Sequence, residues 1–248
     1  MEVHHHPQLH HDKKPWKEYL LEGLMIFLAV FMGFIAESLR ERIADKNRER
    51  EYMVSMVEDL RSDTTALSAF IIREKVRIAM ADSLIDLLYS ANVKQEGNDL
   101  YFFARNMSLI DQVIFNDRTR QQLKSSGNMR LVNNVKVSNA IMAYDQALRE
   151  TEFQMGQVEI LRQSYREVAT KVFNMKIFND MLRDGKIARL NTNPQLFSTD
   201  AAAVNTCVGA IQYVKNAALT QSREAVELLK NADELIKLIK QGYNLKEE

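Results

Sequence analysis

The sequence contains few of the residues that end helices, form disulfides or support nucleophilic catalysis. Its 248 residues include 3 prolines and 8 glycines, fewer than chains with many turns or strands use. The single cysteine, Cys207, excludes an intrachain disulfide framework. No histidine follows His11, which excludes Ser-His and Cys-His catalysis from the rest of the chain. These absences favour an all-α protein without a catalytic constellation.

Charge and missing motifs narrow the function classes further. Lys and Arg together number 33, as do Asp and Glu, so the formal net charge is zero and there is no basic footprint for nucleic acid. The phosphate-binding patterns GxxxxGKS/T and GxGxxG are absent. Carboxylates alternate with Lys and Arg, as they do on solvated helix faces. We expect a protein that is not an enzyme, with no catalytic or cofactor-binding residues and no nucleic-acid partner.

One uncharged apolar run, residues 23–36, lies near the N-terminus. Widening it to residues 19–39 gives a stretch of about 20 residues, which is enough to cross the hydrocarbon of a bilayer. Trp16 precedes it, where an aromatic belt would lie. We therefore predict a transmembrane helix over residues 15–39.

Two alternatives to a membrane anchor remain open. A cleaved signal peptide also has a short apolar core, but cleavage after Ala36 would place bulky Phe34 where a small residue is wanted. A buried core helix would need walls on every side to cover it. With the anchor as the preferred interpretation, residues 1–14 form a head that we expect to be disordered, and residues 40–248 form a helical domain.

Charges on either side of the apolar run bear on its topology. Three lysines precede the run, and five basic residues follow it, interleaved with acidic ones: Lys13, Lys14 and Lys17 before, and Arg40, Arg42, Lys46, Arg48 and Arg50 after. A strict Lys/Arg count places the C-terminal side in the cytoplasm, whereas large C-terminal domains translocate largely regardless of charge. We expect a short cytoplasmic head and a bulk domain outside the bacterial inner membrane.

Apolar residues recur at alternating spacings of 4 and 3 through the remaining chain, which indicates long helices with one seam each. The first seam runs through Met53, Val57, Leu60, Thr64, Leu67, Ile71, Glu74, Ile78, Ala81, Ile85 and Leu88. A second helix is predicted over 100–114. A short helix follows, capped by Asn116 and Asp117 and ending at Leu123. A third long helix is predicted over about 130–182, and the last one runs from a cap at Asp200 to about Gln241. Residues 92–99 and 184–199 are predicted to be loops. The predicted fold is an N-terminal transmembrane helix continuing into an antiparallel four-helix bundle whose second leg is broken.

Several segments resemble those of a known family. They are the apolar residues 24–36, the charged run 37–51, YMVSMVEDLRSD (residues 52–63) and QLKSSGNMRLVNN (residues 122–134). In this layout the chain resembles a family of single-pass membrane proteins, mostly from Bacteroidetes, that has no assigned activity. The resemblance implies an anchor with a helical domain, and it implies no catalytic residue.

Two segments are candidate binding sites. The head contains a cluster of five histidines, whose imidazoles suit Zn, Ni or Cu; the alternatives are a solvated tail that binds metal adventitiously and the remnant of an expression tag. These residues are His4, His5, His6, His10 and His11. The second is a turn before a predicted helix, where free backbone N–H groups could hold an anion; turn formation and capping explain the same residues without a ligand. Its residues are Ser125, Ser126, Gly127, Asn128 and Arg130.

Polar residues also fall on the predicted seams. Glu74 could fix the register of the helices, or the seam could open to solvent there with Glu74 paired to Arg77. Tyr144 and Tyr165 are predicted to pack in the core, although they could line a small ligand site. Cys207 is predicted to be a core residue.

Three functions remain as hypotheses. We prefer a membrane-anchored protein that mediates protein association, as a homo-oligomer or with another membrane protein, because the first seam is longer than a compact bundle needs. The alternatives are a sensor-like extracytoplasmic bundle that binds a small ligand and works with a separate signalling partner, and metal binding by the histidine-rich head.

Overall fold

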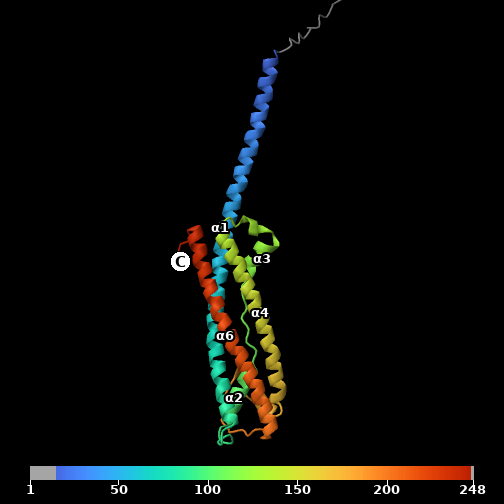
Figure 1. The fold of residues 1–248 in the computed structure, drawn as a ribbon, viewed down its shortest axis with the longest axis vertical. Coiled ribbons are helices and arrows are strands. Elements are labelled where there is room, and N and C mark those ends of the chain that lie inside the picture. The colour runs from blue at the N-terminus through green and yellow to red at the C-terminus, as the bar shows by residue number, and fades with distance from the viewer. Residues whose placement is uncertain (1–14, 247–248) are drawn as a thin grey trace, which may run out of the picture. The chain divides into compact units, whose positions relative to one another are not determined.

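The computed structural model describes residues 15–246 and is mostly helical (Figure 1). The elements in chain order are α1 (Trp16–Leu88), α2 (Gly97–Met107), α3 (Arg118–Ser125), the 3₁₀ helix η1 (Asn128–Leu131), α4 (Val135–Ala169), α5 (Met175–Asp180), β1 (Leu182–Arg183), β2 (Lys186–Ile187) and α6 (Ala201–Tyr243). The histidine-rich head, whose disorder and metal binding were predicted, lies outside the described residues. The chain divides into two units, Met1–Arg50 and Glu51–Glu248.

The described part of the first unit is the N-terminal portion of α1. Its large apolar side chains are exposed along the helix, and the rings of Phe27 and Phe31 stack with their centroids 5.9 Å apart. This helix is long and apolar enough to span a membrane, and none of its most apolar window is buried within the described chain. Its exposure argues against the buried core helix considered above, and its length and composition suit a membrane span or a signal sequence.

Three long helices, α1 from Glu51 onward, α4 and α6, build the second unit and lie side by side along most of their length (Figure 1). The start of α4 and the end of α6 meet: a Cβ on Gly242 would lie 3.4 Å from the side chain of Val137. Along α1 and α6, Lys215 contacts Asp82, and Tyr89 donates to Asn205 at 3.1 Å. Most of the seam residues predicted for α1 are buried, namely Met53, Val57, Leu60, Leu67, Ile71, Glu74, Ala81 and Leu88.

The fourth side of this domain is not one helix. The predicted helix over 100–114 is wrong beyond Met107, because residues 108–117 form an extended connection between α2 and α3. Ile110 and Ile114, which would share one face of that helix, are 58% and 90% exposed. An extended chain advances about 3.3 Å per residue against 1.5 Å in a helix, so this short connection reaches from α2 at one end of the domain to α3 at the other (Figure 1). The predicted four-helix bundle is therefore not confirmed as such.

The predicted third helix was too long at both ends. Asn134 caps the start of α4 by accepting hydrogen bonds from the N–H groups of Lys136 and Val137. After Ala169 the chain turns so that Val172 and Phe173 enter the core. The ring of Phe173 meets that of Tyr101 edge to face at 5.3 Å. Burial of these two side chains by a turn replaces the continued helix.

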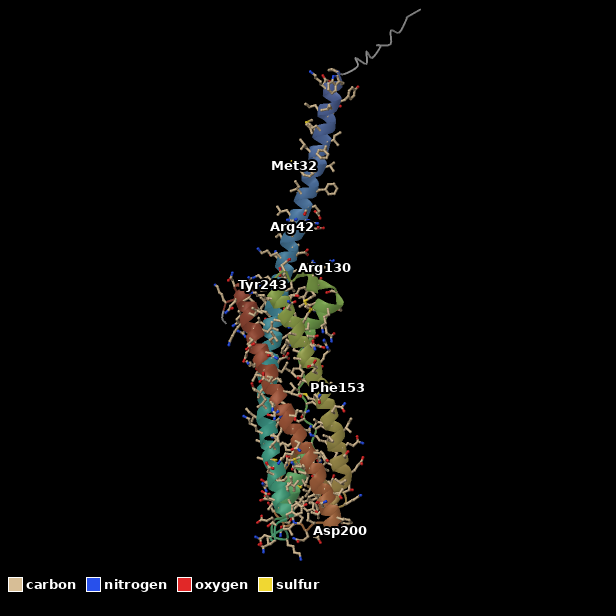
Figure 2. All side chains as sticks on the ribbon, viewed as in Figure 1. Met32, Arg42, Arg130, Phe153, Asp200 and Tyr243 are labelled. Atoms are coloured by element: carbon tan, nitrogen blue, oxygen red, sulfur yellow. The ribbon has the colours of Figure 1, made fainter. Side chains whose placement is uncertain are left out.

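The last predicted helix is confirmed as α6, whose two ends are marked by Asp200 and Tyr243 in Figure 2. Asp200 caps it by accepting from the N–H of Ala203 at 2.8 Å. The predicted loop 184–199 overlaps a small hairpin, β1–β2, in which Asp184 and Gly185 have φ of 48° and 74°. Such left-handed pairs form the two-residue turns that suit hairpins.

Candidate functional site

A layer of buried charge divides the interior of the second unit into two apolar clusters. One cluster includes residues of α1 from Met53 to Ile71, and the other includes residues of α1 from Ala81 to Leu88. Between them lies Glu74 of α1, which is completely buried. Because an ionised group in an apolar interior loses its hydration, this layer is the electrostatically most demanding part of the domain.

Glu74 is the centre of this layer. Its Oε1 accepts a hydrogen bond from Arg77, one turn along α1, and lies 3.5 Å from Nη2 of Arg162 on α4. Arg77 also reaches Asp111 of the extended connection at 3.2 Å, and Arg73 binds the same carboxylate at 2.9 Å. The layer therefore ties α1 to both α4 and the segment that follows α2.

Burial dominates the electrostatics of this cluster. It raises the pKa of Glu74, although Arg77 and Arg162 act to lower it. It also lowers the pKa of Arg162, and repulsion by Arg77 adds to that effect. Within the described residues, Oε2 of Glu74 and Nε of Arg162 have no hydrogen-bond partner. The predicted pairing of Glu74 with Arg77 is confirmed, but the expectation that the seam opens to solvent there is wrong.

Two aspartates of α1 hold α3 in place. Asp59 accepts from the N–H of Thr119 at 2.9 Å, and Asp63 accepts from the N–H of Asn116 at 2.7 Å and from the hydroxyl of Tyr144 at 3.0 Å. Burial raises the pKa of Asp63 despite these hydrogen bonds. It also raises the pKa of Tyr144, and the neighbouring Asp63 adds to that rise.

The cap predicted for α3 at Asp117 is replaced by one from another helix. The side chain of Asp117 accepts no hydrogen bond from a backbone N–H of α3 and instead accepts one from the side-chain amide of Gln121. Asn116 contributes a weak bond, since its Oδ1 lies 3.4 Å from the N of Arg118. A carboxylate at a helix N-terminus pairs with free N–H groups and with the helix dipole, and Asp59 supplies it from α1.

The candidate turn at residues 125–130 comprises the last residue of α3, the two residues that follow it and the start of η1. The hydroxyls of Ser125 and Ser126 donate to carbonyls of α3, and Gly127 takes a left-handed φ of 66°. Asn128 donates to the hydroxyl of Tyr52 at 2.7 Å, while Arg130 is exposed. These contacts account for the turn by capping and backbone geometry, so anion binding there stays a prediction.

The other candidate residues have structural partners. Cys207 is fully buried, and burial raises the pKa of its thiol to about 12, so it is a core residue as predicted. The hydroxyl of Tyr165 donates to the carbonyl of Ala104 at 2.8 Å. Across residues 15–246, no group of three or more His, Cys, Asp or Glu side chains could hold a metal ion.

A groove lies between α4 and α6, and Tyr144, which was named above as a residue that could line a ligand site, lines part of it. It has a volume of about 430 Å³ between Ala147 and Thr151 of α4 and Leu228 of α6, and continues as a second hollow of about 270 Å³. Three alanines on one side of α4 make room for it, namely Ala140, Ala143 and Ala147. Their spacing of 3 and 4 residues was visible in the sequence, but alanine suits a closely packed helix seam equally well.

Comparisons with known proteins add no relative. No protein-family model, no curated protein and no solved structure matches this chain. The resemblance to Bacteroidetes membrane proteins therefore stays a prediction, and the function has to be argued from the residues and their geometry.

Proposed function

We propose that this chain is a non-enzymatic, membrane-anchored protein that mediates protein association, with its bulk domain outside a bacterial inner membrane. One observation carries this proposal: the same helix, α1, contains an unburied apolar segment long enough to span a membrane and the seam that helps build the core of the helical domain. An element with both roles holds a folded domain at a membrane surface.

The surface of the domain supports association. Phe153 of α4, labelled in Figure 2, is 65% exposed, and Ile160 and Tyr213 are also well exposed. A contiguous patch of exposed apolar side chains is typical of surfaces that another protein covers, and these three residues are our candidates for such a patch. We propose as partner a second copy or another membrane protein. We also propose that the domain is a four-helix bundle whose second helix is interrupted and consists of α2, residues 108–117 and α3.

The test measures topology and assembly together on full-length protein in its native membrane. Protease protection of each terminus reports the side on which the domain lies, and native mass after gentle solubilisation reports its assembly. A protected domain in one stable complex is the expected result. A monomer whose domain is digested from the cytoplasmic side would contradict both the topology and the association.

The α4–α6 groove supports a second candidate, a sensor-like domain that binds a small ligand. A ligand that binds only the folded state raises its apparent stability by mass action. Screening small molecules for an increase in Tm of the full-length protein in detergent tests this candidate. A defined complex together with no stabilising ligand would favour association alone.

A further inference from the structure

The α4–α6 groove has an apolar floor and a polar rim. Leu228 and Leu235 of α6 are buried at its base, whereas Ala143 and Asn231 beside them are exposed. The two hollows share Asn231, so they adjoin each other along the helix pair. Together their lining residues run from Arg223 to Leu238 of α6, about 22 Å at 1.5 Å per residue, which is about four helical turns.

The rim of this groove is acidic. Four glutamates line it against a single cation, Arg223, and they are Glu150, Glu224, Glu227 and Glu234. Within the described chain none of the four forms a salt bridge. Glu224 lies deepest: burial raises its pKa, and its Oε2 is buried without a hydrogen-bond partner. A carboxylate held this way gains from a cation that enters the groove.

We infer that the α4–α6 groove docks a basic amphipathic helix of a partner protein, an inference that rests on the proposed association function. An apolar stripe of such a helix would contact Ala143, Ala147 and Leu238, which are exposed or partly exposed in the two hollows. Its Lys or Arg side chains would meet the glutamates of the rim. Charge complementarity selects this occupant. A second copy docked through the same groove would place glutamates against glutamates, which like-charge repulsion disfavours.

Site-specific photocrosslinking in the native membrane tests the inference. A photoreactive amino acid at Asn231 in the full-length protein is activated by light, and mass spectrometry identifies the crosslinked peptide. We expect a Lys/Arg-rich helical segment of another protein. The double variant Glu227→Lys/Glu234→Lys should lower the crosslink yield about tenfold, since repulsion replaces attraction at two rim positions.

A matched control changes the net charge equally outside the groove. Asp233 of α6 and Glu152 of α4 are exposed and do not line the groove, so Asp233→Lys/Glu152→Lys should leave the crosslink unchanged. Four outcomes would overturn the inference and leave the association function standing. They are a crosslinked peptide from a second copy, a lipid adduct, an equal loss of crosslink in both double variants, and no crosslink from protein that is in a complex. A native mass showing only monomer would overturn both.

Discussion

Replacing the buried carboxylate of Glu74 with an apolar side chain should destabilise the domain more than replacing it with an uncharged amide. In Glu74→Leu, Arg162 loses its nearest acceptor while remaining almost fully buried beside Arg77. An uncompensated buried charge costs about 3–5 kcal/mol, and about 2–4 °C of Tm accompanies each kcal/mol in a domain of this size. We therefore expect Tm to fall by roughly 6–20 °C in differential scanning fluorimetry of the detergent-solubilised protein.

Two companion variants separate charge from hydrogen bonding. Glu74→Gln removes the negative charge but keeps an oxygen acceptor for Arg77 and Arg162, so its Tm should fall less than that of Glu74→Leu. Glu74→Leu/Arg162→Met removes both charges and should unfold at or above the temperature of the native protein. The reasoning would be refuted if Glu74→Leu kept the native Tm, or if the double variant were as unstable as Glu74→Leu alone.

Four further outcomes are expected. The folded-state pKa of Glu74 lies above its unfolded value of 4.5, so the stability that it contributes is full below pH 4.5 and is lost as pH rises through the raised pKa. Over this pH window the Tm of the native protein should fall relative to that of Glu74→Gln. A constant difference between the two Tm values would contradict the prediction. Asp59→Ala should cost about 1–2 kcal/mol and speed hydrogen exchange in α3 first, whereas uniform exchange would show that the cap is dispensable. Gly97→Ala should lower Tm because its Cβ would clash with the backbone carbonyl of Pro194, in the loop between β2 and α6. Gly156→Ala, in open space on α4, should raise stability by about 0.5–1 kcal/mol, and equal effects of the two variants would exclude the clash. Phe31→Arg places a charge in the apolar segment, which should cost about 3 kcal/mol of membrane-insertion free energy. The variant should therefore be extracted from membranes by alkaline carbonate, whereas the native chain should not.

The bounds of a helix were predictable from the sequence where a regular apolar spacing begins next to a capping residue. In α6 the seam is continuous and Asp200 supplies a cap, so both its start and its length were anticipated. The end of α4 was missed because Val172 continues the helical spacing, although it is buried by a turn instead. Periodicity alone cannot distinguish these two ways of burying the same residue.

The extended connection and the charged layer depend on contacts between distant residues. Ile110 and Ile114 have helical spacing, but Asp111 between them is held by Arg73 and Arg77 of α1. The pair Glu74–Arg77 lies within one turn and was foreseen. Its burial depends on Arg162, which is 88 residues farther along the chain, and such proximity cannot be read from local pattern.

The helices that cover the apolar seam of α1 are synthesised after it. The apolar seam of α1 ends at Leu88, whereas α6, which covers part of it, ends at Tyr243. At about 5–20 residues per second, the ribosome completes α6 roughly 8–30 s after α1. During that interval the seam of α1 has no permanent cover. Until its partner helices are complete, this apolar seam needs a temporary cover, such as a chaperone that shields the first helix.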